Sequence, residues 1–189
     1  MIGHNKGPSM ATGQAWRKLC WQKSRNAMMP KLPLEVLRIR VARAKALGLD
    51  YTSYASIRAA SGHDVIAFLF SSNALRAFAK SPEMPADRVE KLAGLQNSIQ
   101  LAATLKPLSA EQFIANLPQD PAPLFDQIFA APSFNATWSQ TRTTLLRGLR
   151  PEKLPSNMVV VIGDTPSERN WAEAANLAGY LNADRFFAP

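Results

Sequence analysis

The chain has 189 residues, of which 47% are hydrophobic and 19% are charged, a balance typical of one globular domain with at most an appendage. Such a chain buries roughly 70% of the surface that it exposes when unfolded, which suffices for a core without disulfides or a structural metal. One cysteine and two histidines exclude an intramolecular disulfide framework and argue against a Cys/His zinc site. We therefore expect no metal, and no motif indicates a cofactor.

The formal net charge of +8 is concentrated near one end of the chain. Residues 1–60 carry eleven Lys and Arg against two acids, whereas residues 61–189 carry eleven against twelve. A basic segment beside a neutral one attracts polyanions, most often nucleic acid, because cations near phosphates release condensed counterions. A basic face without a polyanionic partner is the alternative interpretation.

We expect a cytoplasmic protein without membrane contact. The opening MIGHNKGPSM lacks the apolar stretch of a secretory signal, and Ile2 does not fit the N-myristoylation motif. The strongly apolar runs, 65–70 and 158–162, are far shorter than the roughly 20 residues of a membrane-spanning helix.

Gly and Pro in residues 1–14 predict a flexible arm. Residues 15–62 then read as a basic helical region, with helices at about 14–27, 34–47 and 51–60. Gly48 is placed to end the second of these in a left-handed cap, and Asp50 to begin the third as its N-cap.

Helix 34–47 shows one apolar and one cationic side. Leu37, Val41 and Ala44 recur at helical spacing toward the predicted core, and the basic residues fan over the other side. Basic side chains interleaved with tryptophans suit phosphate contact and base stacking. The predicted polyanion-binding residues are Arg17, Lys18, Lys23, Arg25, Arg38, Arg40, Arg43 and Lys45, with Trp16 and Trp21 for stacking.

Residues 63–189 predict an α/β domain with a small parallel sheet of two to three strands flanked by helices. The runs at 65–70 and 158–162 are apolar throughout, as expected of strands covered on both faces, and 98–105 is a weaker candidate. Between and after these strands we expect helices at 74–80, 86–95, 109–117, 124–130, 135–148 and from 165 to about 181. Two of these helices should begin with a capping box, formed by Ser109 with Gln112 and by Thr165 with Glu168.

A helix-turn-helix over 52–76 is an alternative that the sequence leaves open, because the Ser61-Gly62 turn suits it. Its second helix would lack donors for base edges, since 65–70 is entirely apolar.

Two strand ends carry small polar residues that begin a helix. In an open parallel sheet, ligands bind at the carboxyl ends of strands, where free N–H groups at helix starts suit a phosphate or carboxylate. If the two strands are neighbours, one crevice would be lined by both loops, although helix capping alone would also select these residues. The candidate ligand-binding residues are Ser71, Ser72, Asn73, Gly163, Asp164 and Thr165.

The stretch Val161-Ile162-Gly163-Asp164-Thr165 resembles the late acidic motif of haloacid-dehalogenase-type phosphatases. That resemblance implies an aspartate nucleophile, with a second acid two residues later, at the end of an earlier strand. Here the first predicted strand ends in Phe70-Ser71-Ser72-Asn73, without an acid. The resemblance covers five residues, and no catalytic role follows from it.

Other candidate reactive residues are few. Cys20 lies among cations that favour a reactive thiolate, but packing on a helix face is the preferred interpretation, since no histidine is close in the sequence. His63 and Asp64 form a possible general-base pair at the entry of the first predicted strand.

Catalytic residues are therefore unknown, and whether the protein is an enzyme is left open. The leading hypothesis is a non-enzymatic binding protein whose basic N-terminal helices contact nucleic acid or another polyanion. The alternative is an enzyme or sensor for a small phosphorylated or carboxylated ligand at loops 71–73 and 163–165. A third is a protein–protein adaptor, for which an exposed patch at Trp16, Trp21 or Phe186-Phe187 would be the sign.

Overall fold

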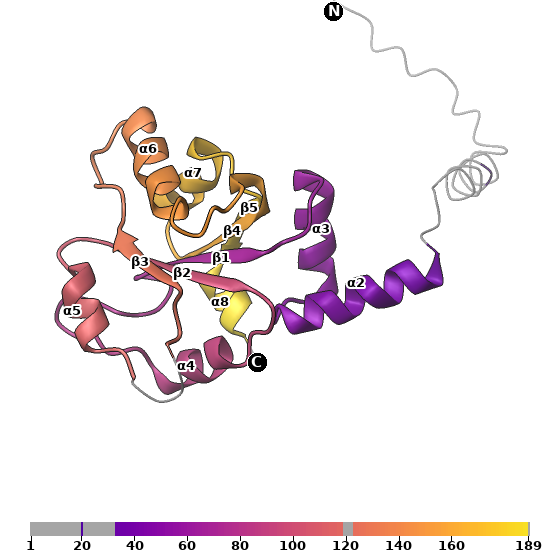
Figure 1. The fold of residues 1–189 in the computed structure, drawn as a ribbon, viewed down its shortest axis with the longest axis horizontal. Coiled ribbons are helices and arrows are strands. Elements are labelled where there is room, and N and C mark those ends of the chain that lie inside the picture. The colour runs from indigo at the N-terminus through magenta and orange to yellow at the C-terminus, as the bar shows by residue number, and fades with distance from the viewer. Residues whose placement is uncertain (1–19, 21–32, 119–122, 189) are drawn as a thin grey trace, which may run out of the picture. The chain divides into compact units, whose positions relative to one another are not determined.

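A computed structural model describes residues 20, 33–118 and 123–188 (Figure 1). The chain divides into two compact units, Met1–Arg38 and Ile39–Pro189. The predicted arm and, apart from Cys20, the predicted helix at 14–27 lie outside the described residues.

The second unit contains a sheet of five parallel strands in the order β3-β2-β1-β4-β5. In the central strand β1, Leu69 pairs with Leu101 on one side and Val161 on the other. The predicted parallel α/β class is confirmed, but the predicted number of strands is wrong. The strands are β1 (Ala67–Ser71), β2 (Ile99–Thr104), β3 (Gln127–Ala130), β4 (Val159–Gly163) and β5 (Gly179–Asn182).

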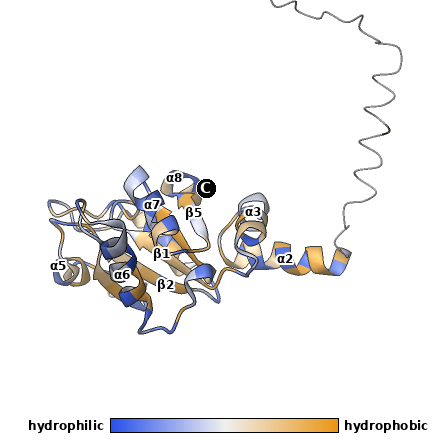
Figure 2. Cartoon of the chain, turned by 90° about the horizontal axis from the view of Figure 1, so that it is seen from above, coloured by the Kyte–Doolittle hydropathy of each residue, from blue (hydrophilic) through white to orange (hydrophobic). Residues whose placement is uncertain are grey.

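Helices cover both faces of this sheet (Figure 1). Alternate residues of β1 point to opposite faces. Phe68 belongs to the core cluster that includes residues of α4, α5 and α8, and Leu69 belongs to the cluster that includes residues of α6 and α7. Figure 2 shows the hydrophobic strands between helices that mix polar and apolar residues. The helices are α2 (Leu34–Ala46), α3 (Tyr51–Ser61), α4 (Ala86–Ala93), α5 (Ala110–Ala115), α6 (Trp138–Leu149), α7 (Pro166–Ala174) and α8 (Ala183–Phe187), with a 3-10 turn at Ser156–Met158.

Local capping fixes several helix ends as predicted. Asp50 accepts a hydrogen bond from the backbone N–H of Ser53 at the start of α3, and Gly48 adopts a left-handed φ of 63° after α2. Capping boxes begin α5 at Ser109 and α7 at Thr165. Each satisfies backbone N–H groups that a helix start would otherwise leave unpaired.

Two predicted helices are wrong, and a third is shorter than predicted. Residues 74–80 form turns, because the chain leaves β1 through a left-handed Arg76 (φ 55°) and a bridge between Phe78 and Ser81. The predicted helix at 124–130 contains strand β3, and the helix after Thr165 ends at Ala174, before β5. Both missed strands have four residues and lie at the sheet edges, too short to show a period.

The helix-turn-helix alternative is also wrong, because residues 67–71 form the central strand of the sheet. No helix in the described ranges combines the length and apolarity needed to span a bilayer.

Candidate functional site

The sheet order places the two predicted ligand loops side by side. β1 and β4 are hydrogen-bonded neighbours, with Phe70 paired to Ile162. The chain proceeds from β1 toward β2 and β3, and from β4 toward β5 in the opposite direction. The loops after β1 and β4 therefore diverge at a topological switch point, where doubly wound folds hold their ligands.

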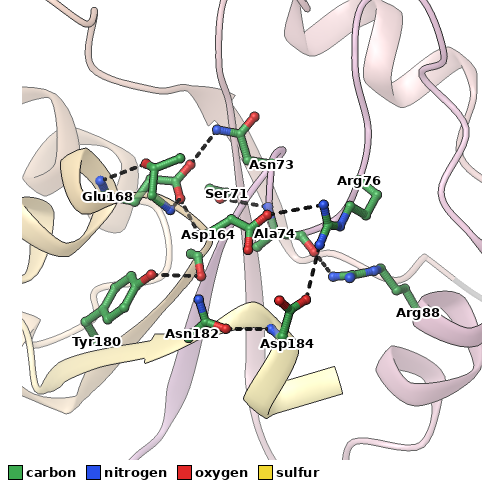
Figure 3. A network of polar contacts seen from close by, with 12 residues as sticks. Ser71, Asn73, Ala74, Arg76, Arg88, Asp164, Glu168, Tyr180, Asn182 and Asp184 are labelled. Atoms are coloured by element: carbon green, nitrogen blue, oxygen red, sulfur yellow. Dashed lines mark hydrogen bonds and ion pairs between the residues drawn. The ribbon is translucent and has the colours of Figure 1, made fainter. Parts of the chain in front are cut away.

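Glu168 occupies this switch point. Its side chain is fully buried, and its Oε2 accepts hydrogen bonds from the backbone N–H groups of Asp164 at 2.5 Å and Thr165 at 2.9 Å. Its Oε1 accepts a bond from the amide of Asn73 at 2.9 Å, which joins the two loops (Figure 3). The carboxylate thus takes the position at the start of α7 that an anionic ligand would otherwise occupy.

Gly163 makes room for this arrangement. A Cβ at this position would lie 2.8 Å from Glu168 Cβ and 2.8 Å from Tyr180 Cε2. Tyr180 donates from its hydroxyl to the Gly163 carbonyl at 3.0 Å, and burial raises the pKa of this phenol. A larger residue at 163 would displace one of these two side chains.

The two serines after β1 serve the backbone. Ser71 Oγ accepts from the N–H of Ala74 at 3.0 Å, and Ser72 Oγ accepts from the N–H of Leu105 at 3.0 Å. Both serines are buried. Ser71 thus stabilises the turn after β1, and Ser72 holds this turn against the residue that follows β2. Neither serine caps a helix, because no helix follows β1 directly.

Arg76 supplies the cation of this network. Its guanidinium lies 3.5 Å from Asp164 Oδ2 and 3.1 Å from Asp184 Oδ1, and so bridges the ends of β4 and β5 (Figure 3). Its left-handed φ of 55° is uncommon for a side chain of this size. The bridge compensates the two carboxylates that would otherwise attract an external cation.

Arg88 of α4 places a second guanidinium near this network, and unlike the exposed Arg76 it is buried. It donates to the Ala74 carbonyl and lies 4.3 Å from the ring centroid of Phe187. Desolvation, with a smaller effect of Arg76, lowers the pKa of Arg88. Arg88 thus ties the loop after β1 to the carboxyl-terminal helix α8.

The switch point is therefore occupied by the protein's own charges. Glu168 accepts the backbone N–H groups at the start of α7, and Arg76 pairs with Asp164 and Asp184. The end of β1 presents Ser71 and Asn73 in place of the acids that phosphatase-type chemistry would need. Within the described ranges, no three His, Cys, Asp or Glu side chains are grouped closely enough to hold a metal.

The cations of α2 have different surroundings. Arg43 donates to Asp64 at 3.3 Å, to the Asn97 carbonyl at 3.0 Å and to the Val65 carbonyl at 2.8 Å, so that all three of its nitrogens bind within the protein. Arg38 pairs with Glu35 at 3.0 Å, with both side chains largely exposed. In the described part of the chain, Arg40 and Lys45 form no ion pair.

Asp64 is the centre of a polar cluster at the amino end of β1. It accepts hydrogen bonds from Tyr54 at 2.7 Å and Arg43, and it pairs with Arg58 at 3.4 Å. Burial, followed by the hydrogen bond to Asp64, raises the pKa of Tyr54. His63 is exposed and directly precedes Asp64 in the chain. It lies at the amino end of β1, whereas the switch point lies at the carboxyl end of the same strand.

The remaining basic and aromatic residues predicted to bind a polyanion lie outside the described residues. Of the first 32 residues the structure describes Cys20 alone, which is partly buried. The following predicted residues lie outside the described ranges: Trp16, Arg17, Lys18, Trp21, Lys23 and Arg25.

Sequence reasoning missed two surface features. Lys45, Lys91 and Arg185 share the lining of one hollow, although they are far apart in the sequence. Phe134 and Trp138, at the β3–α6 connection, are 94% and 55% exposed. Phe134 lies in a turn before α6 begins, so no helical spacing marks this pair in the sequence. The sign of an adaptor named for Phe186-Phe187 is not found there, because Phe186 is buried against Phe68 and Phe70 and Phe187 is partly buried.

Comparison of the chain with protein-family models, with curated proteins and with solved structures found no match to any of the three.

Proposed function

We propose that this is a non-catalytic binding protein that contacts nucleic acid, or another polyanion of similar charge density, through its basic N-terminal part. The observation that carries the proposal is the charge partition: eleven basic and two acidic residues in 1–60, against a nearly neutral remainder. Phosphate contacts supply most of the affinity of sequence-independent binding.

The surroundings of the described α2 cations support this proposal in part. Lys45 is exposed and Arg40 is half-buried, and the Arg38–Glu35 pair is exposed on both sides. Exposed pairs contribute about 0–1 kcal/mol, so Arg38 can exchange its carboxylate for a phosphate at little cost. Arg43 is reserved for the fold by its three internal bonds and is not part of the proposed contact surface.

The filled switch point favours this function over a small-ligand enzyme. A phosphorylated or carboxylated ligand at loops 71–73 and 163–165 would have to displace buried Glu168, whose oxygens already bind three donors. Replacing one set of charge-assisted hydrogen bonds with another gives little net affinity.

The test is the salt dependence of binding between the full chain and a fluorescent single-stranded oligonucleotide, followed by anisotropy. Four phosphate contacts predict a log–log slope of about −3, since each contact contributes about −0.7 on a single strand. Replacing Arg17, Lys18, Lys23 and Arg25 with Gln should flatten the slope, and the control Lys80→Gln should not. A slope near zero for the unaltered chain would refute the proposal.

A second function, docking of a protein partner, is favoured by the exposed pair Phe134 and Trp138. These rings border a small hollow of about 140 Å³ that Ser167, Asn170 and Trp171 also line. Exposed aromatic side chains beside a pocket are common anchors at protein interfaces. Phe134→Ser should abolish capture of such a partner without changing oligonucleotide binding; equal capture by Phe134→Ser would refute this second function.

A further inference from the structure

A hollow of about 560 Å³ lies at the carboxyl-terminal end of α2, where this helix meets the turn to α3, α4 and α8. Val41, Ala44, Leu49, Tyr51 and Phe186 give it a mainly apolar lining. Small-molecule sites in proteins commonly have volumes of about 300–1,000 Å³ and a similar apolar lining with a few polar groups. The hollow is therefore large enough for one nucleotide.

The charged side chains of the hollow are mostly cationic. Lys45, Lys91 and Arg185 line it, against the single carboxylate of Asp50. Asp50 is already engaged, because it accepts bonds from the Ser53 N–H at 2.8 Å and the Ser53 hydroxyl at 2.5 Å. Its remaining contact, with Arg185 at 3.4 Å, is an exposed pair that provides little compensation.

Lys91 is the most constrained of these cations. Its ammonium donates to the Ala188 carbonyl at 2.9 Å and lies 5.4 Å from the centroid of the Phe186 ring. Desolvation by burial lowers the pKa of Lys91, and no carboxylate of the described residues forms an ion pair with it. An ammonium has three donors, so two are available to an incoming anion.

Tyr51 adds an aromatic side chain to the same lining. It is only half-buried, since it packs at the border of the core. Bases stack on exposed aromatic side chains, and cations beside them bind the phosphates. The hollow thus combines the two kinds of group that a nucleotide uses for binding.

We infer that this hollow binds a nucleotide through its phosphate, with Lys45, Lys91 and Arg185 around the phosphate and Tyr51 beside the base. The inference extends the proposed function, because Lys45 belongs to the basic helix α2. The nucleotide is either a free mononucleotide or one unit of a bound strand, and both present the same phosphate and base.

The experiment is calorimetric titration of the full chain with AMP, adenosine, inorganic phosphate and the oligonucleotide rA10. We expect AMP or rA10 to bind, and Lys91→Gln to weaken that binding by about tenfold or more. Lys91→Arg should retain most of the affinity, and the control Lys80→Gln, on the turn after β1, should retain all of it. Adenosine should bind much more weakly than AMP, because it lacks the phosphate.

Comparing the AMP and rA10 titrations shows whether the hollow binds a free nucleotide or one unit of a strand. Binding of AMP without rA10 supports a free nucleotide and refutes the proposed polyanion function. Binding of rA10 that Lys91→Gln weakens supports a strand unit, whereas rA10 binding unchanged in Lys91→Gln overturns the pocket and leaves the polyanion function standing. Equal losses in Lys91→Gln and Lys80→Gln would also overturn the pocket, since they would reflect net charge alone.

Discussion

Replacing Glu168 with Ala tests whether this carboxylate fills the switch point as an internal anion. The change removes the acceptor of two backbone N–H groups and of the Asn73 amide, all at a buried position. A buried donor left unpaired costs about 1–3 kcal/mol. Water that enters the vacated space would accept hydrogen bonds from some of these donors. We therefore expect the free energy of unfolding to fall by about 3 kcal/mol, which is three donors at the lower end of that range.

Thermal and urea unfolding would measure the loss. For a protein of this size, about 3 kcal/mol corresponds to a Tm lower by about 6–12 °C. Glu168→Gln keeps the shape and one acceptor oxygen and should lose about 1–2 kcal/mol. Asn73→Ala, which removes a single partner of the same carboxylate, should also lose less than Glu168→Ala.

Rescue by a small anion separates an electrostatic role from simple packing. Acetate can enter the space left in Glu168→Ala and bind the freed N–H groups, and at about a hundred times its Kd it would restore about 2.7 kcal/mol. Chloride at equal ionic strength controls for screening. A Glu168→Ala protein as stable as the unaltered chain, or one stabilised equally by both salts, would refute the internal-anion interpretation.

Three further predictions concern stability and the exposed aromatic pair. Gly148→Ala should destabilise the protein by about 1–3 kcal/mol in urea unfolding, because a Cβ there overlaps the ring of Phe129; an unchanged midpoint would contradict this packing. Burial and the hydrogen bond to Asp64 raise the pKa of Tyr54 above its ordinary value of about 10. The contribution of the Tyr54 hydroxyl to the free energy of unfolding is therefore complete below about pH 10, and it is lost as the pH rises through the pKa that Tyr54 has in the folded protein. Stability should therefore fall above about pH 10 more steeply in the unaltered chain than in Tyr54→Phe, and parallel curves would contradict the assignment. Phe134→Ser should leave the Tm within about 1 °C, since an exposed ring contributes little to folding, and a large decrease would show that the ring is packed.

The sequence predicted the parts of the fold that depend on local chemistry. The buried strands around Leu69 and Val161 stand out as apolar runs, and the capping boxes at Ser109 and Thr165 mark helix starts through residues three positions apart. Strands β3 and β5 escaped prediction because four residues at a sheet edge show neither a period nor a continuous apolar run. What makes them strands is pairing with β2 and β4, which is a tertiary effect.

The local features of the site could be predicted from the sequence, but its contacts between distant segments could not. The sequence indicated that the loops after β1 and β4 would meet if their strands were neighbours, and they do. It also identified Glu168 as a capping-box residue, but not its contact with Asn73, 95 positions away. The sequence offered no reason to select Lys91 and Arg185, which are single basic residues on separate helices. They lie near Lys45 only because α2, α4 and α8 pack around one hollow.

The most direct test of the central claim is to map where a nucleic acid contacts the protein, by NMR titration of the isotope-labelled full chain with a single-stranded oligonucleotide. We predict that amide shifts change at Lys45, Tyr51 and Lys91, and that the loops at Asn73 and Asp164 are unaffected. Shift changes confined to those two loops would contradict the claim, because they would place the ligand at the switch point that Glu168 and Arg76 fill.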